Sequence, residues 1–204
     1  DALPISITGT VVNPSETPVV NSWVVPIGSS TGEYFWQLGA NSRGDGSFGL
    51  NVPSGTYKVE ANVPWGVSDL AKSATCSVTV ANGAVTTSSG GCVKPDKSIQ
   101  LALRAPNLTF TLKNDGVAVP NANVSISVGK WSTSAQSNGT GQVAFFIDAD
   151  AIRTLNATSS SQPIYVWVNP PYGSSTVATW NCVSGDATKP ICSTLLLSFL
   201  QSLA

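Results

Sequence analysis

The sequence contains no histidine and no methionine, and charged residues make up only 10% of its 204 positions. Without histidine the chain lacks the commonest general base, the base of the usual Ser and Cys triads and the commonest zinc ligand. The formal net charge of −1 leaves no basic footprint for nucleic acid or an anionic membrane. The composition therefore indicates a protein that is not an enzyme, needs no cofactor or metal ion and does not bind nucleic acid.

Long apolar runs are also missing. No run approaches the ~20 residues of a membrane helix, and the nearest candidate, Leu195 to Leu200, has the length of a strand, so we expect no membrane insertion. The chain opens Asp-Ala-Leu-Pro without methionine, which predicts a mature form with its signal peptide removed, or an internal fragment. What the sequence has instead is 42% apolar residues among many Ser, Thr, Asn, Gly and Val, a composition typical of a folded, β-rich chain.

The four cysteines do not form a C-x-x-C pair of the kind that binds zinc or shuttles electrons. Their even number favours two disulfides. Disulfides form in oxidising compartments, so we expect an extracellular or cell-surface location.

An internal repeat organises the chain. Three segments of the first half match three of the second: Asn13 to Gly28 with Asn114 to Gly129, Trp36 to Gly46 with Trp131 to Gly141, and Glu60 to Gly66 with Trp167 to Gly173. Cys76 and Cys92 take the places of Cys182 and Cys192, which predicts one bridge in each half. The repeat predicts two domains, residues 1–104 and 105–204, each long enough to bury its own core.

Alternation of apolar and polar residues, with Gly and Pro between the runs, predicts seven strands in the first half. They are Ile5 to Val12, Trp23 to Ile27, Tyr34 to Leu38, Ser47 to Val52, Thr56 to Val63, Ala74 to Val80 and Lys97 to Leu103. In the fifth, Tyr57, Val59 and Ala61 fall on the core face and Glu60 on the outward face. The second half repeats this plan, except that Asp148 to Leu155 predicts one or two helical turns. We therefore predict an all-β fold of two tandem immunoglobulin-like (Greek-key) β-sandwiches with one disulfide each.

Four motifs of the first half carry a resemblance to a known family. They are Gly9-Thr10-Val11, Pro18-Val19-Val20-Asn21, Asp45-Gly46-Ser47-Phe48 and Pro53-Ser54-Gly55-Thr56-Tyr57-Lys58-Val59. With them the first half, and more weakly the second, resembles the carboxypeptidase regulatory-like family, within the transthyretin-like and collagen-adhesin B-type sandwiches. The resemblance implies a β-sandwich fold and says little about function, because such modules serve as appendages and scaffolds in many secreted proteins.

Some collagen-adhesin relatives form a Lys-to-Asn isopeptide bond beside an acid. The first predicted strand of this chain has no Lys, Glu60 is expected to face outward, and Lys113 has no buried acid evident near it. We therefore do not expect an isopeptide bond.

Aromatic residues fall into two groups. Trp36 and Trp131 hold equivalent places in the repeat, which predicts a shared role in the core. Trp65 and Tyr172 each lie between Pro and Gly, which predicts loop positions with a partly exposed ring. Such a ring either packs against a neighbouring domain or stacks on a sugar, so Trp65 and Tyr172 are our candidate ligand or packing aromatics.

Three further patterns have ordinary structural explanations. Arg43-Gly44-Asp45 spells the integrin-recognition tripeptide on a predicted hairpin tip, but the equivalent Asn138-Gly139-Thr140 suggests a simple turn. Asp148 and Asp150 have the chemistry to ligate a hard cation, and helix capping explains them equally well. Asn-x-Ser/Thr sequons occur at Asn107, Asn123, Asn138 and Asn156 and allow glycosylation without indicating it.

Our leading functional prediction is a non-catalytic structural or adhesive component of a cell surface, associating with itself or with other surface proteins. In one version the apolar segment Ala2 to Val12 leaves its own sandwich and completes the sheet of a neighbouring copy, which builds a filament by strand exchange. The alternative is a carbohydrate-binding accessory module of a secreted enzyme, which would bind polysaccharide through exposed aromatics such as Trp65.

Overall fold

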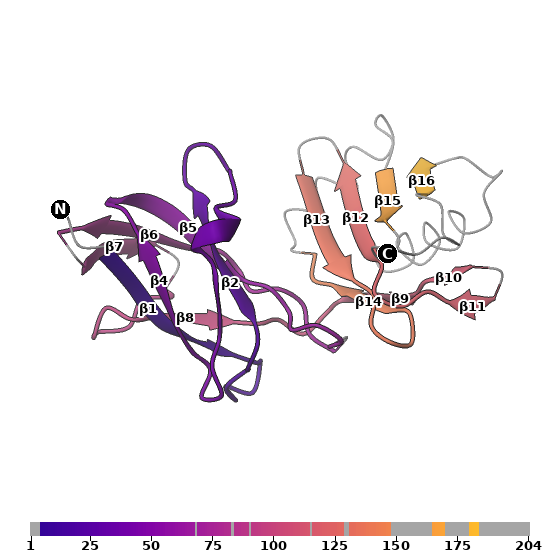
Figure 1. Ribbon diagram of the computed structural model, residues 1–204, viewed down its shortest axis with the longest axis horizontal. Helices are drawn as coiled ribbons and strands as arrows, with labels where there is room; N and C mark the ends of the chain where they lie inside the picture. Colours follow the sequence, from indigo (N-terminus) through magenta and orange to yellow (C-terminus); the bar gives the residue numbers. More distant parts are fainter. Residues whose placement is uncertain are drawn as a thin grey trace. The chain divides into compact units, whose positions relative to one another are not determined.

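The structure, a computed structural model, describes residues 5–67, 69–82, 84–89, 91–114, 116–128, 131–147, 165–169 and 180–183. These residues form strands joined by turns, with one short 3₁₀ helix, so the predicted all-β class is confirmed (Figure 1). The chain divides into two compact units. Unit 1 comprises Asp1–Trp65 and Leu70–Ala105, and unit 2 comprises Gly66–Asp69 and Pro106–Ala204.

Unit 1 is a sandwich of two sheets. Its strands are β1 (Ile5–Val12), β2 (Trp23–Gly28), β3 (Ala40–Asn41), β4 (Ser47–Val52), β5 (Gly55–Ala61), β6 (Cys76–Ala81), β7 (Ala84–Ser89) and β8 (Ile99–Ala102). One sheet has the order β4-β1-β8, in which β1 is antiparallel to β4 and parallel to β8. The other has the order β3-β2-β5-β6-β7 and is antiparallel throughout.

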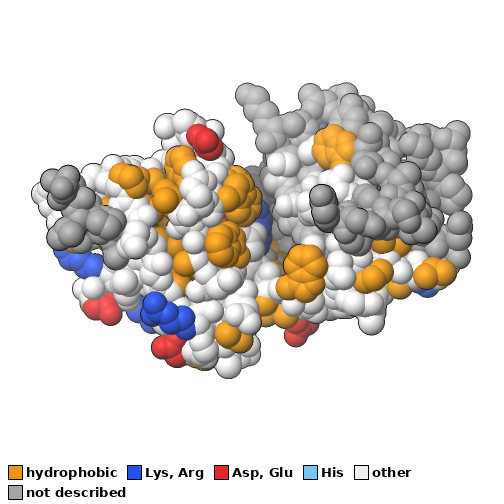
Figure 2. All heavy atoms as spheres, viewed as in Figure 1, with side chains coloured by type: hydrophobic (Ala, Val, Ile, Leu, Met, Phe, Trp, Pro, Cys, Tyr) orange, Lys and Arg blue, Asp and Glu red, His pale blue; other side chains and the backbone are white. Residues whose placement is uncertain are grey.

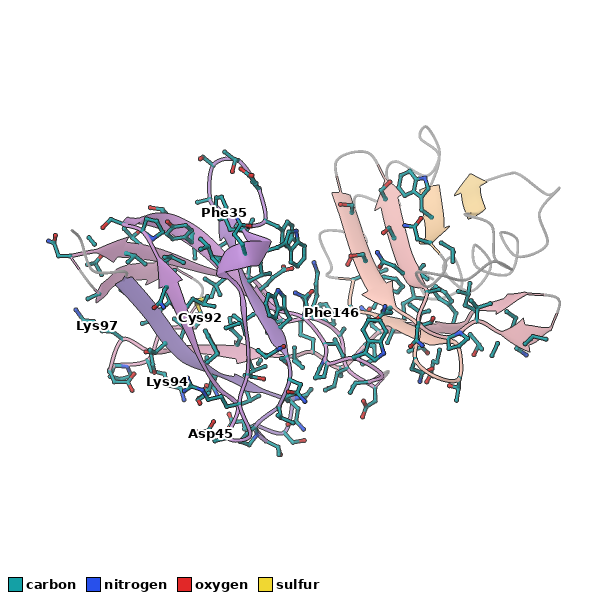
Figure 3. All side chains as sticks on the ribbon, viewed as in Figure 1. Phe35, Asp45, Cys92, Lys94, Lys97 and Phe146 are labelled. Carbon is teal, nitrogen blue, oxygen red and sulfur yellow. A yellow bond between two sulfur atoms is a disulfide. The ribbon has the colours of Figure 1, made fainter. Side chains whose placement is uncertain are left out.

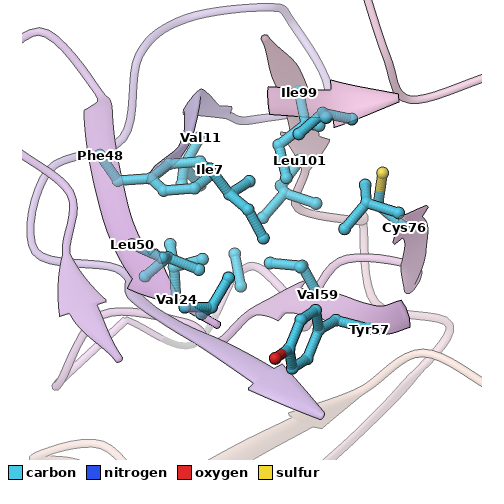
Figure 4. Packing of buried hydrophobic residues seen from close by; sticks show 14 of the residues in the cluster. Ile7, Val11, Val24, Phe48, Leu50, Tyr57, Val59, Cys76, Ile99 and Leu101 are labelled. Atoms are coloured by element: carbon cyan, nitrogen blue, oxygen red, sulfur yellow. The ribbon is translucent and has the colours of Figure 1, made fainter. Parts of the chain in front are cut away.

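The two sheets of unit 1 face each other across one apolar core (Figure 4). Both contribute alternate residues, as a half-buried strand requires. Phe48 of β4 and Tyr57 of β5 are both buried there. They come from opposite sheets, however, because β4 and β5 are consecutive in sequence but not paired.

The predicted bounds of β1 and β4 are correct, and the predicted strand Tyr34 to Leu38 is wrong. Its place is taken by the 3₁₀ helix η1 (Trp36–Leu38), and β3 is only two residues long. A strand that the sequence did not suggest, β7, pairs with β6 at the sheet edge.

Pro26 explains the missing strand. The Pro26 carbonyl accepts a hydrogen bond from the Phe35 amide at 3.0 Å, so the backbone polar groups of Pro26 point toward the β3 side of β2. A proline nitrogen has no hydrogen to donate there. The ladder is therefore interrupted beside Pro26. Tyr34 still forms an isolated bridge to Ile27, the chain then turns through η1, and pairing resumes where Ala40 lies opposite Val24.

A disulfide between Cys76 and Cys92 links the two sheets of unit 1, with 5.8 Å between the two Cα atoms. Cys76 begins β6 of the five-stranded sheet, and the Cys92 carbonyl accepts from the Gln100 amide of β8 in the other sheet at 2.7 Å. The first predicted bridge is therefore present. The loop that it closes contains β7.

Unit 2 contains the strands β9 (Leu108–Thr111), β10 (Lys113–Asn114), β11 (Val117–Ala118), β12 (Asn123–Val128), β13 (Trp131–Gln136), β14 (Gln142–Phe145), β15 (Tyr165–Asn169) and β16 (Trp180–Val183). Its described residues form one sheet of order β13-β12-β15-β16 and two strand pairs, β14-β9 and β10-β11. Several predictions fall outside the described residues: the helical turns at 148–155, the ring of Tyr172 and the bridge from Cys182 to Cys192.

One buried corner has the same hydrogen bonds in both units. In unit 1 the Ser42 hydroxyl accepts from the Ser22 amide at 2.9 Å and donates to the Val19 carbonyl at 2.7 Å. In unit 2 the Ser137 hydroxyl accepts from the Ala122 amide at 2.8 Å and donates to the Val119 carbonyl at 2.8 Å. The sequence repeat therefore corresponds to a repeat in space.

The turns beside these serines also match. Gly46 and Gly141 have φ values of +76° and +78°, and a Cβ on either would lie 2.7 Å from a backbone carbonyl, of Val11 or of Leu112. Asn21 and Asn121, which precede the two corner amides of Ser22 and Ala122, both adopt positive φ, at 61° and 58°. At positions 46 and 141 the backbone needs a positive φ and leaves no room for a Cβ, and only glycine satisfies both conditions without strain.

Candidate interaction surface

The outward face of the five-stranded sheet of unit 1 is covered where β2 and β5 pair. Glu60 lies on this face, opposite Val25, and both residues are buried, with Glu60 only 3% exposed. The sequence correctly placed Glu60 on the side away from the core but wrongly predicted that this side faces solvent. The side chains of Tyr34 and Lys72 cover it.

Two side chains partner the buried Glu60 carboxylate. The Tyr34 hydroxyl donates to Glu60 Oε1 at 3.1 Å, and Lys72 Nζ lies 3.4 Å from the same oxygen. Burial, then the negative charge of Glu60, then this hydrogen bond raise the pKa of Tyr34 to about 12. The hydroxyl therefore stays protonated at neutral pH and remains a donor. These contacts fix the position of the Tyr34 ring.

Trp36 lies on the Tyr34 ring. The two ring centroids are 4.9 Å apart and the planes differ by 11°, so the rings stack. Trp36 is nevertheless 54% exposed, and the prediction that it serves the core is wrong. Hydrophobic side chains are visible over the η1 region of unit 1 in Figure 2. We call Tyr34 and Trp36, with Glu60 and Lys72 beneath them, the aromatic platform.

Trp65 is the most exposed tryptophan for which the structure describes a side chain, at 70% of its surface. Its ring is therefore available for contact. The other candidate aromatic, Tyr172, lies outside the described residues. The pairing of Trp65 with Tyr172 as ligand or packing aromatics stays a prediction.

The Arg43-Gly44-Asp45 tripeptide forms part of the turn between β3 and β4, as expected (Figure 3). The Gly46 amide donates to the Arg43 carbonyl at 2.9 Å, and Asp45 Oδ1 accepts from the Ser47 amide at 2.9 Å. Hydrogen bonds from the side chain and the backbone of Ser47 lower the pKa of the exposed Asp45 carboxyl. The Asp45 side chain thus has a structural role in closing the turn.

The described sequon asparagines differ in how their side chains are held. Asn107 donates to the Ile147 carbonyl and accepts from the Ile147 amide, at 2.7 and 2.8 Å. Asn123 is exposed on β12. Asn138 accepts three hydrogen bonds within its turn. Asn156 lies outside the described residues, as do Asp148 and Asp150.

Within the described ranges no three His, Cys, Asp or Glu side chains lie together as a metal site would require. In the same ranges the structure has no helix whose length and apolar character would let it cross a membrane. What the described surface offers is an exposed Trp36 ring stacked on a half-buried Tyr34 ring. Sequence reasoning missed this pair because it assigned Tyr34 to Leu38 to a strand, although Pro26 in the neighbouring strand argued against that assignment.

Comparison with known proteins gives no family assignment. No family model matches the chain, and no curated protein matches it. The predicted resemblance to carboxypeptidase regulatory-like domains therefore stays a prediction.

Several solved structures superpose on much of the chain at low similarity. The shaft pilin spaA from Lactobacillus rhamnosus GG is 10% identical, with 89% of this chain and 93% of that chain covered and a TM-score of 0.34. A streptococcal ancillary pilin is 9% identical, with coverages of 91% and 60% and a TM-score of 0.37. The Bacillus anthracis TIE protein is 10% identical, with coverages of 89% and 32% and a TM-score of 0.35. TM-scores this low do not establish a shared fold, so these likenesses assign no function to this chain.

Proposed function

We propose that the chain is an extracellular structural protein, a load-bearing spacer of a cell surface that associates with further copies or with other surface proteins. The observation that carries the proposal is the parallel pairing of the first and last strands of unit 1. Gly9 of β1 lies opposite Ile99 of β8, and Val12 lies opposite Ala102. The Leu103 amide extends this ladder by donating to the Val12 carbonyl at 2.8 Å.

Parallel strands have their N-terminal ends on the same side. The chain therefore enters β1 at one end of unit 1 and leaves β8 at the opposite end, as an in-line spacer requires. A pull along the chain loads the hydrogen bonds between β1 and β8 together, in shear. An antiparallel pair pulled from neighbouring ends would instead open one bond at a time.

The disulfide reinforces this arrangement. The segment around Cys92 is hydrogen-bonded to β8, and Cys92 is bonded covalently to Cys76 of the opposite sheet. The β8 side of the sheared pair is thereby tied to β6. Closing a loop of this length also lowers the conformational entropy of the unfolded chain, which stabilises the fold by about 3 kcal/mol.

The structure gives no support to strand exchange by the N-terminal segment. β1 is the middle strand of its sheet, bordered by β4 and β8, and its Ile7 and Val11 side chains are fully buried. Releasing β1 would break two ladders and open the core. We therefore propose association through surfaces outside β1.

Single-molecule force spectroscopy tests the load-bearing role. Handles before Ile5 and after Leu103 load β1 and β8 in shear, and we expect an unfolding force several times that of a matched control. In the control the handles are placed before Ile5 and after Val52, which pair at one end of β1 and β4, so the pull unzips them. Equal forces in the two geometries would contradict the proposal. Electron microscopy of the native protein tests self-association.

A second candidate, polysaccharide binding, is favoured by one observation, the exposure of Trp36 and Trp65. A flat exposed ring can stack on a sugar face. Tryptophan fluorescence titrated with soluble polysaccharides tests it, with Trp36→Ala and Trp65→Ala beside the parent protein. Val117→Ala is the matched control, because Val117 is as exposed as Trp65 but not aromatic. A parent protein that shows no spectral change with any polysaccharide would eliminate this candidate.

A further inference from the structure

We infer that Asn138 is a site of spontaneous deamidation, in which the fold of unit 2 assists attack by the Gly139 amide nitrogen on the Asn138 side chain. Asn138 and Gly139 lie in the turn that joins β13 to β14 (Figure 1). This inference is independent of the proposed load-bearing function.

Three donors surround the oxygen that would become charged during the attack. Asn138 Oδ1 accepts from the Thr140 amide, the Thr140 hydroxyl and the Gln142 amide, each at 2.9 Å. Attack on Cγ turns this carbonyl oxygen into an oxyanion. Donors already aimed at such an oxygen stabilise its developing negative charge without further reorganisation, as in the oxyanion holes of enzymes.

The attacking nitrogen is accessible. Gly139 is exposed, and a Cβ placed on it would meet nothing within 4 Å. Within the described part of the chain its amide donates to no acceptor in the hydrogen-bond network of the turn. Because Gly139 has no side chain, little opposes the approach of its nitrogen to Asn138 Cγ.

The reaction is balanced by water alone. The Gly139 nitrogen loses its proton to solvent and forms a bond to Asn138 Cγ. The bond from Cγ to Nδ2 breaks, and Nδ2 leaves as ammonia with a proton from solvent. Water then opens the cyclic imide at either carbonyl, which gives aspartate or isoaspartate at position 138. Both products carry a carboxylate where the parent has a neutral amide.

Two other positions each lack one part of this combination. Asn13 Oδ1 accepts from the Ser15 and Thr17 amides, both at 2.9 Å, but Pro14 follows and its nitrogen has no proton to lose. In unit 1 the position equivalent to Asn138 is Arg43, which has no side-chain amide. Asn13 has the hydrogen-bond donors but no attacking N–H after it, and Arg43 has no side-chain amide to be attacked, so neither position can react in this way.

Peptide mapping by mass spectrometry tests the inference, using full-length protein made in a host without N-glycosylation and incubated at mildly alkaline pH. We expect Asn138 to convert at least as fast in the folded protein as in the same chain unfolded in denaturant, and isoaspartate to appear in the tryptic peptide. Thr140→Val removes one donor and should slow conversion about tenfold, the effect of one lost hydrogen bond. Thr140→Ser keeps the hydroxyl and should convert like the parent.

Two results would overturn the inference. One is slower conversion of Asn138 in the folded protein than in the unfolded chain, since an ordinary rigid turn hinders the attack. The other is equal conversion in Thr140→Val and Thr140→Ser, since the hydroxyl would then play no part. Asn13 should remain intact throughout and serves as the internal control.

Discussion

The two units share a buried corner and differ in the strand that follows it. In both, one serine hydroxyl links two backbone segments at nearly the same distances. Beyond the corner, β13 of unit 2 runs for six residues beside β12, whereas β3 of unit 1 has two. The register places Pro26 of unit 1 where unit 2 has Ile126. The strand opposite Pro26 is interrupted by η1, which carries Trp36 of the aromatic platform.

The largest expected effect comes from transferring that proline. Ile126→Pro should remove a buried side chain and one donor of the β12–β13 ladder, and so should destabilise unit 2 by about 3 kcal/mol. Ile126→Val controls for the smaller side chain and should cost about 1 kcal/mol. Denaturant unfolding measures both. If the proline variant were no less stable than the valine variant, Pro26 would not explain the short β3.

Removal of the corner serines should have the next largest effect. Ser42→Ala and Ser137→Ala each leave a buried amide and a backbone carbonyl without their side-chain partner, at a cost of about 2 kcal/mol in the unit concerned. Native-state hydrogen exchange can assign each loss to its unit. Ser132→Ala, at an exposed position of β13, is the control and should be nearly neutral. A clear difference between the two losses would show that the corners are energetically unlike.

A smaller effect should follow from exchanging one residue between the corners. Ser22 Oγ is buried and, among the described residues, has no hydrogen-bond partner, whereas unit 2 has the fully buried Ala122 at the same place. Ser22→Ala should therefore stabilise unit 1 by about 1 kcal/mol, and Ala122→Ser should destabilise unit 2 by a similar amount. Thermal unfolding of the pair measures both shifts. Loss of stability in Ser22→Ala would reveal a partner for this hydroxyl.

The smallest effect concerns the aromatic platform of unit 1. The pKa of Tyr34 is raised from 10.0 to about 12, so the folded state favours the neutral phenol. The associated stability is complete below pH 10 and is lost as the pH rises toward 12. Tyrosinate absorbance should show one fewer tyrosine with a raised pKa in Tyr34→Phe than in the parent. Between pH 10 and pH 12 the parent should lose more stability than the variant. Identical alkaline titrations would contradict the buried contact with Glu60.

Much of the fold could be predicted from local pattern. The alternation in Ile5 to Val12 and Ser47 to Val52 gave both strands with correct bounds, because each has one face in the core. The Asp45-Gly46 turn was predictable because positive φ at a tight turn favours glycine. β7 was missed because its run of small and polar residues, AVTTSS, shows no clear alternation at the sheet edge.

The candidate site was harder to predict, because it depends on contacts between distant segments. The alternation of β5 identified the outward face of Glu60 correctly, but a pattern within one strand cannot show what covers that face. Tyr34 lies 26 positions before Glu60, and Lys72 lies 12 positions after it. The equivalence of Trp36 and Trp131 in the internal repeat was misleading, because Trp36 begins a 3₁₀ helix whereas Trp131 begins a strand.

The covalent loop closed by Cys76 and Cys92 also bears on survival outside a cell. Residues 77–91 between the two cysteines contain no Lys, Arg or aromatic residue, so proteases that cleave after those side chains find no site there. A protease of broader specificity that cut this stretch once would leave two pieces still joined through sulfur. The two pieces of such a cleaved chain would stay covalently connected until a reductant broke the disulfide.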